Sequence, residues 1–116
     1  MMAYDSADGY LYAVDCCHLI VIDPSTNALV ALSGNAPSGP NTGFATDIAW
    51  DENNDSVYVA HMLPPWGNIS VFSGATHRYV GDIAISNLPS ETDWYTIAVD
   101  SHSGLLYAAA TTYQKG

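Results

Sequence analysis

Ala3-Tyr4-Asp5, followed after a short turn by Tyr10-Leu11-Tyr12-Ala13, is the stretch that decides the fold, because the chain repeats it twice. The later copies are Ala49-Trp50-Asp51 with Ser56-Val57-Tyr58-Val59, and Ala98-Val99-Asp100 with Leu105-Leu106-Tyr107-Ala108. The repeated aspartates lie 46 residues apart in the first interval and 49 residues apart in the second. A period of this size, built from short alternating segments, predicts a repeat protein whose unit is a small sheet.

Each repeat is expected to contribute antiparallel strands, since it contains short runs of β-branched and aromatic residues separated by turn residues. The expected strands, in chain order, are Met2–Asp5, Tyr10–Val14, Leu19–Ile22, Ala28–Leu32, Asp47–Asp51, Ser56–Ala60, Ile69–Phe72, Arg78–Asp82, Thr96–Asp100 and Leu105–Ala109. Four strands in a period of about 40–50 residues are typical of a β-propeller blade. The predicted fold is therefore all-β, with about two and a half four-stranded blades of an incomplete ring.

The predicted organisation is a single partial β-propeller domain over residues 1–116, with repeat 1 at 2–46, repeat 2 at 47–95 and half of repeat 3 at 96–116. Repeat units bury their apolar faces against neighbours, so few repeats alone are marginally stable. Three explanations are open: a piece of a longer propeller, self-assembly into a ring or polymer of blades, or a compact sandwich. A head-to-tail contact that does not close makes a filament.

The turn after the repeated aspartate has a consistent chemistry. A residue suited to positive φ occupies one turn position in each repeat: Gly9, Asp55 and Gly104. The aspartates themselves, Asp5, Asp51 and Asp100, are expected to accept N–H bonds from the turn. The alternative is that they converge on a cation, since carboxylates suit hard cations. Recurrence in every repeat favours the structural role.

The same cycle resembles the YVTN and NHL-type β-propeller repeats, which are common in bacterial and archaeal surface proteins. The resemblance rests on Ile97-Ala98-Val99-Asp100 with Gly104, Tyr107 and Ala108, and on Val21-Ile22-Asp23-Pro24-Ser25-Thr26-Asn27. It implies a propeller fold and six to eight repeats in one chain, against about two and a half here. It implies little about function, because propellers host binding, scaffolding and diverse enzymes.

The composition excludes several classes of partner. The chain carries 12 acidic and 2 basic residues, for a formal net charge of -10. Two basic residues are too few to neutralise nucleic-acid phosphates, and anionic membrane surfaces are disfavoured for the same reason. No apolar run is long enough to insert into a membrane, and no signal peptide is visible. A polar surface built from Ser, Thr, Asn, Gly and Tyr is common on extracellular and cell-surface proteins, which gives the expected localisation.

The longer connections of the blades are expected to share one rim, where function tends to concentrate. Three aromatic residues in these connections are candidate ligand-binding residues, for a glycan or a protein: Phe44, Trp66 and Trp94. The alternative is that they close apolar gaps over the blades. Asn68-Ile69-Ser70 matches the N-glycosylation pattern, so Asn68 is a glycosylation candidate.

Cys16-Cys17-His18 is the most unusual triplet, and in the repeat register it lies beside His61 and Met62. Thiolate, imidazole and thioether are soft ligands, so Cys17, His18 and His61 are candidate ligands of a soft metal such as copper. The alternatives are a strained vicinal disulfide, or apolar packing with surface histidines. Otherwise no cofactor is expected.

The sequence contains no nucleophile elbow, zinc motif, phosphate loop or dinucleotide fingerprint. We therefore expect a non-enzymatic repeat module that mediates protein association. The expected partner is the chain itself, as a homo-oligomer or polymer, or the rest of a longer propeller. A carbohydrate-binding module using the rim aromatics is the first alternative, and a metal-binding enzyme-type propeller is the second.

Overall fold

The computed structural model describes residues 1–15, 18–33, 45–62, 68–84 and 92–112, and every regular element in these ranges is a strand. The strands are β1 (Met2–Asp5), β2 (Tyr10–Val14), β3 (Leu19–Asp23), β4 (Ala28–Ser33), β5 (Ala45–Asp51), β6 (Ser56–His61), β7 (Asn68–Ser73), β8 (Tyr79–Ala84), β9 (Thr92–Asp100) and β10 (Leu105–Thr112). Within the described ranges there is no helix with the length and hydropathy needed to span a membrane.

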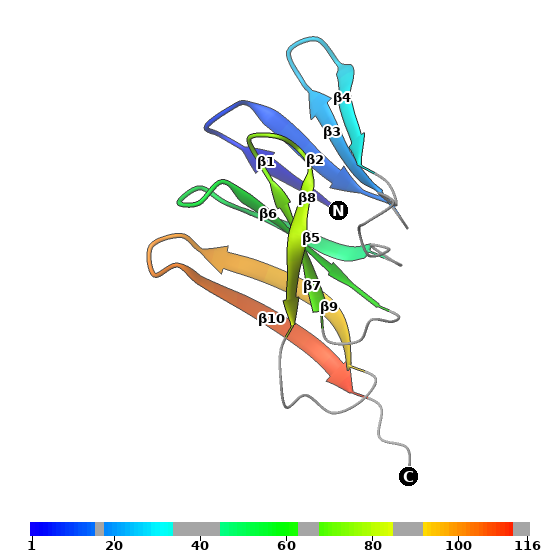
Figure 1. Cartoon of the computed structure of the whole chain (residues 1–116), viewed down its shortest axis with the longest axis vertical. Coiled ribbons are helices and arrows are strands. Elements are labelled where there is room, and N and C mark those ends of the chain that lie inside the picture. Colours follow the sequence, from blue (N-terminus) through cyan, green and yellow to red (C-terminus); the bar gives the residue numbers. More distant parts are fainter. Residues whose placement is uncertain (16–17, 34–44, 63–67, 85–91, 113–116) are drawn as a thin grey trace.

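The strands form three antiparallel sheets in which neighbours in the chain are neighbours in the sheet. Blade 1 is β1-β2-β3-β4, blade 2 is β5-β6-β7-β8, and blade 3 consists of β9 and β10. Figure 1 shows the three sheets following one another along the long axis of the molecule. The predicted all-β fold of propeller-type blades in an incomplete ring is confirmed.

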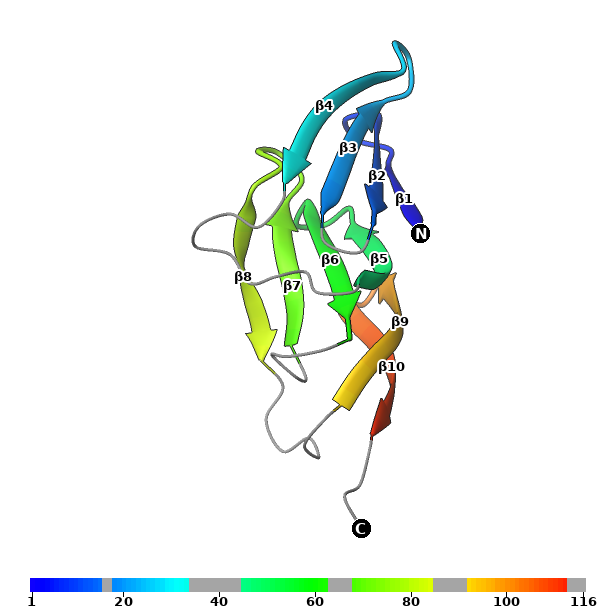
Figure 2. The same ribbon diagram turned by 90° about the vertical axis from the view of Figure 1, so that its right-hand side faces the viewer.

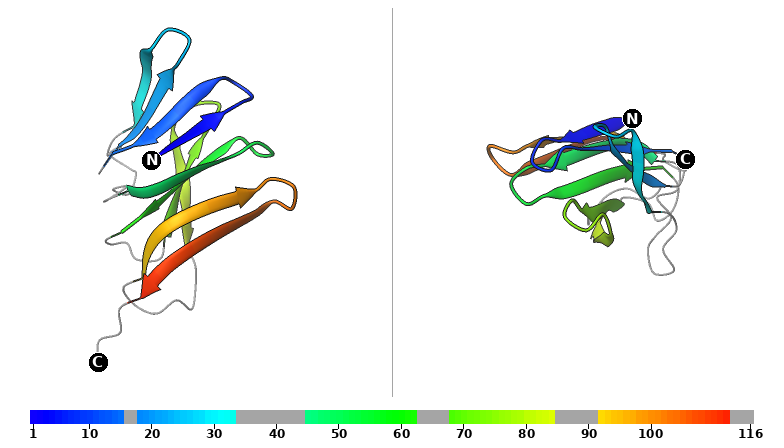
Figure 3. Two further views of the ribbon diagram at one scale, coloured as in Figure 1. Left: turned by 180° about the vertical axis from the view of Figure 1, so that it is seen from behind. Right: turned by 90° about the horizontal axis from the view of Figure 1, so that it is seen from above.

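The blades pack face to face, and their first strands contact one another, β1 against β5 and β5 against β9 (Figures 2 and 3). We call the contact of blades 1 and 2 seam 1, and that of blades 2 and 3 seam 2. The buried core of seam 1 comprises Tyr12, Leu19, Val21, Ile48, Val57, Val59 and Phe72. The buried core of seam 2 comprises Tyr58, Ala60, Ile69, Trp94 and Ile97. Blade 2 therefore contributes one face to each seam.

Strand alternation explains how one blade serves two seams. Tyr58 and Val59 are adjacent in β6, so their side chains point to opposite faces of the sheet. Tyr58 lies in the core of seam 2 and Val59 in the core of seam 1. Both are apolar, as expected of a strand that is buried on both faces.

The turns between the first two strands of each blade are held by the repeated aspartates. Asp5 Oδ1 accepts the N–H groups of Ala7 and Asp8 at 2.9 and 3.1 Å. Asp51 Oδ1 accepts the N–H of Asn53 at 2.9 Å, and Asp100 Oδ1 accepts the N–H of His102 at 3.0 Å. Each turn also contains a residue with positive φ: Gly9 at 80°, Asp55 at 51° and Gly104 at 73°. These are the backbone roles expected of the repeated turn.

Candidate functional site

One repeat position has a different environment in each blade. Tyr12 is 0% exposed, Tyr58 is 9% exposed and Tyr107 is 56% exposed. Tyr12 is covered by blade 2 and Tyr58 by blade 3, whereas no described residue covers Tyr107. The face of blade 3 that carries Tyr107 therefore has the kind of residue that is buried in the seams. No blade among the described residues covers it.

On the opposite face of the blades, the exposed fraction of equivalent residues falls along the chain. Met2 in blade 1 is 67% exposed, while its equivalents Ile48 and Ile97 are 5% and 6% exposed. Blade 1 covers Ile48 and blade 2 covers Ile97. The outward face of blade 1 is thus the second half of a seam, again without a described neighbour.

Each of these end faces carries a group of exposed apolar side chains. Residues paired across a ladder share a face, and the register places Met2, Tyr4, Leu29 and Leu32 on the blade 1 end face. The blade 3 end face carries Leu105 and Tyr107, beside a shallow hollow of about 240 Å³ lined by Thr96, Ile97, Ala98, Tyr107, Ala108 and Ala109. Contiguous exposed apolar patches mark interaction sites.

Seam 2 is fixed by polar contacts in addition to its apolar core. Asp47 Oδ2 accepts hydrogen bonds from Thr96 Oγ1 at 2.7 Å and from the N–H of Ile97 at 2.9 Å. Thr46 Oγ1 donates to the carbonyl of Trp94 at 2.7 Å. At the turn, the Asn53 side-chain amide donates to the carbonyl of Ser101. These directional bonds set the orientation of blade 3 on blade 2.

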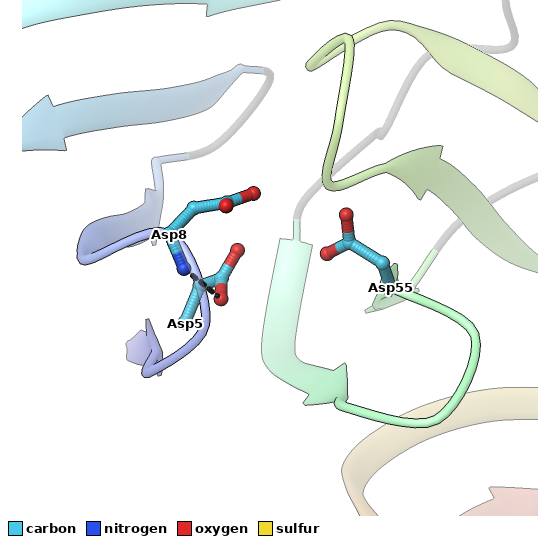
Figure 4. A group of neighbouring side chains, drawn as sticks. All are labelled: Asp5, Asp8 and Asp55. Carbon is cyan, nitrogen blue, oxygen red and sulfur yellow. Dashed lines mark hydrogen bonds between the residues drawn. The ribbon is translucent and has the colours of Figure 1, made fainter.

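Seam 1 has a different polar composition. Asp5 and Asp8 of blade 1 lie next to Asp55 of blade 2, and one carboxylate oxygen from each lies within 4.8 Å of the others (Figure 4). The hydroxyl of Tyr12 donates to the carbonyl of Gly74 at 3.1 Å beside this group. Burial raises the pKa of Tyr12, and the negative charges of the three aspartates raise it further.

The acidic group was not among the predicted sites. The repeated aspartates Asp5, Asp51 and Asp100 belong to three separate turns, and only Asp5 takes part in the group. The signal was nevertheless present in the sequence, because Asp55 occupies a turn position where the other repeats have glycine.

The predicted metal ligands are only partly described. His18 lies before β3, where its Nδ1 is 3.1 Å from Asp15 Oδ2 and its backbone N–H donates to Asp15 Oδ1 at 2.7 Å. His61 ends β6 and is 2% exposed. Cys17 lies outside the described residues. Within those residues, His18 and His61 belong to no group of three metal-ligating side chains, so the soft-metal site stays a prediction.

Among the rim aromatics, Trp94 is described. It was placed in a connection between blades, but β9 begins at Thr92, so Trp94 lies in a strand. It is 5% exposed and packs into the core of seam 2, in line with the alternative that it closes an apolar gap and not with an exposed contact residue. Phe44 and Trp66 lie outside the described residues. Asn68 begins β7, and its side chain is not described.

No protein-family model matches this chain, and no curated protein matches its sequence. Solved structures are similar in fold. Hydrazine synthase of Kuenenia stuttgartiensis superposes with a TM-score of 0.76 at 16% identity, over 96% of this chain and 29% of that one. The U3-55K structure and the WD40 repeats of RRP9 each give a TM-score of 0.64 at 12% identity, over 84% of this chain and 26% of theirs.

These similarities concern the fold alone, since the identities are low. The chain spans less than a third of the length of each of these three structures. The match to WD40 repeats agrees with blades of a β-propeller, without indicating the YVTN or NHL type.

Proposed function

We propose that this chain is a non-enzymatic protein-association module whose two end faces pack against further propeller blades. The observation that carries the proposal is the exposure gradient at one repeat position, where Tyr12 and Tyr58 are buried and Tyr107 is 56% exposed. Apolar burial contributes about 25 cal/mol for each Å² removed from water. Covering Tyr107 and its neighbours therefore favours association.

The two end faces are suited to each other. The blade 3 end face carries the repeat position of Tyr58, and the blade 1 end face carries the repeat position of Ile48. These are the two halves of a seam, so the blade 1 face of one copy is suited to cover the blade 3 face of another. We therefore favour a second copy of this chain as the partner, in a head-to-tail contact that closes into a ring or continues as a polymer. Further blades of the same polypeptide would use the same faces.

The finer assignments rest on the sequence. The resemblance to YVTN and NHL repeats and the polar, lysine-poor surface support a place among extracellular or cell-surface proteins. The acidic charge makes nucleic acid and anionic membranes unsuitable partners.

The first experiment is the native mass of the 12.4 kDa chain by light scattering on a sizing column. We expect a multiple of the chain mass, and a monomer for Tyr107→Asp, which places a charge on the blade 3 end face. The matched control is Val80→Asp on β8, since Val80 is 66% exposed and lies on neither end face. A folded wild-type monomer at every concentration, or equal loss of mass in both variants, would contradict self-association.

A further inference from the structure

The three carboxylates of seam 1 come from two blades and converge on one point. Asp5 ends β1, Asp8 lies in the turn that follows, and Asp55 lies in the turn between β5 and β6. One oxygen from each is within 4.8 Å of the others. Figure 4 shows the carboxylates of Asp8 and Asp55 facing each other across the gap between the two turns, with Asp5 beside them.

One carboxylate oxygen of Asp5 is buried without a hydrogen-bond donor from the described part of the chain. The residue is 0% exposed, and its Oδ1 already accepts two backbone N–H groups. Its other oxygen, Oδ2, is also buried and has no hydrogen-bond donor among the described residues. In Figure 4 this oxygen points toward the space between Asp8 and Asp55. A buried carboxylate oxygen without a donor is costly, so a bound water or ion is the usual explanation.

The negative charge of this group is not balanced by a basic side chain in the part of the chain that the structure describes. The sequence has two basic residues, Arg78 and Lys115. Arg78 forms no ion pair with the three aspartates, and Lys115 lies outside the described residues. His77 lies on this seam, where its Nδ1 is 3.3 Å from the Tyr12 hydroxyl. Like charges at such short separations repel one another.

The equivalent positions of seam 2 lack this charge. Asn54 replaces Asp8, and Gly104 replaces Asp55, leaving Asp51 as the one carboxylate of the three. There the turns are joined by the neutral hydrogen bond from Asn53 to Ser101. In seam 1 the equivalent of Asn53 is Ala7, which has no side-chain donor. The turns after the repeated aspartates are therefore joined by a hydrogen bond in seam 2, whereas those of seam 1 bring three carboxylates together.

We propose that Asp5, Asp8 and Asp55 bind a divalent cation of the calcium type, which joins blade 1 to blade 2. Calcium takes oxygen ligands at about 2.3–2.6 Å in a flexible geometry, so two ligands on opposite sides of the ion lie about 5 Å apart. The three oxygens of seam 1 lie within 4.8 Å of one another, which is compatible with that size. Magnesium requires near-ideal octahedral geometry at about 2.0–2.1 Å and usually keeps several waters, so three carboxylates from two turns suit the flexible geometry of calcium better.

Two further features suit a binding site. Asp8 is exposed, so the group is accessible from solvent. The indole N–H of Trp50 donates to Asp55 Oδ1 at 3.0 Å, which orients that carboxylate as outer partners of metal ligands do. Gly74 leaves the space that Asp55 occupies, since a Cβ at Gly74 would overlap Asp55 Oδ1.

The test is calcium binding to the full chain by titration calorimetry, with thermal unfolding recorded in CaCl₂, in MgCl₂ and in EDTA. We expect one calcium per chain and a rise in Tm of roughly 10 °C at about 100 times Kd. Terbium luminescence reports where the ion binds. Trp50 lies beside the three carboxylates, so its indole is expected to sensitise the luminescence of a terbium ion bound there.

Asp55→Gly is the decisive variant, because the other two repeats have glycine at this position with positive φ, so the turn tolerates it. We expect calcium affinity to fall about tenfold or more and the calcium-dependent rise in Tm to disappear. Glu52→Gln is the matched control, since it removes one exposed charge from the same turn without changing the three carboxylates. Absence of binding in the wild-type chain, or equal binding by Asp55→Gly, would overturn the proposal.

Discussion

In seam 2, Asp47 of blade 2 accepts two hydrogen bonds from β9 and Asn53 donates to the neighbouring turn, whereas in seam 1 the turns bring three carboxylates together. The equivalent of Asp47 in blade 1 is Met1, whose side chain has no carboxylate. Both seams nevertheless bury a tyrosine at the same repeat position. The apolar positions of the repeat are therefore kept from seam to seam, while the polar groups differ.

This difference has a physical reason. Apolar burial is non-directional, so one set of residue types covers any neighbouring blade. Hydrogen bonds and ion binding require particular atoms in particular places, so each seam needs its own polar residues. The polar groups therefore differ between the two seams. Such differences are suited to determine which blade packs against which.

The largest expected effect concerns the shared tyrosine position. Tyr12→Ala removes a fully buried ring from seam 1 and should lower the free energy of unfolding by about 3–5 kcal/mol. Tyr107→Ala changes the same repeat position on an exposed face and should change stability by less than about 0.5 kcal/mol. The measurement is urea unfolding of each monomeric variant at low concentration. Similar losses in both variants would mean that Tyr107 is already covered.

A smaller effect is expected from the polar contacts of seam 2. Asp47→Ala removes the acceptor of two hydrogen bonds from blade 3 and should destabilise the chain by about 1–3 kcal/mol. Asp47→Asn keeps one acceptor oxygen and should lose less. Hydrogen exchange of the amides of β9 and β10 should report the loss, with little change in β1 to β4. An equal increase of exchange in blade 1 would contradict a role confined to seam 2.

The blade strands could be predicted from the sequence because their signals are local. Alternating apolar residues and turn residues lie within each strand and its flanking turn, so the ten expected strands coincide with β1 to β10 apart from their ends. The clearest difference is β9, which begins at Thr92 rather than Thr96. Trp94 extends this strand by packing into seam 2, a contact that depends on blade 2 rather than on the residues beside it.

The acidic group of seam 1 could not be predicted in the same way. Asp8 and Asp55 are distant in the sequence and come together because blade 1 stacks on blade 2. The repeat register shows which turns are equivalent, but not which turn of one blade touches which turn of the next. The aspartate in place of glycine at position 55 was the one local indication that this turn differs from the others.

The smallest expected effect is the pH dependence of stability that comes from Asp100. This residue lies in the turn of blade 3 and is not part of the carboxylate group of seam 1. Hydrogen bonds from Ser103 Oγ and from the N–H of His102 hold the pKa of Asp100 below its ordinary value of 3.8. The unfolded chain therefore binds the proton more readily. The contribution of Asp100 to stability is complete above the unfolded pKa and is lost as the pH falls through the lower folded pKa.

Asp100→Asn removes this titration while keeping an acceptor for the His102 N–H. We expect the difference in urea midpoint between wild type and this variant to be small at pH 7 and to shrink toward pH 2, because Asp100 is only partly buried and solvent screens its charge. A difference that stays constant over this range would contradict the lowered pKa. Repeating the series in CaCl₂ should leave this difference unchanged, since Asp100 lies outside the carboxylate group of seam 1.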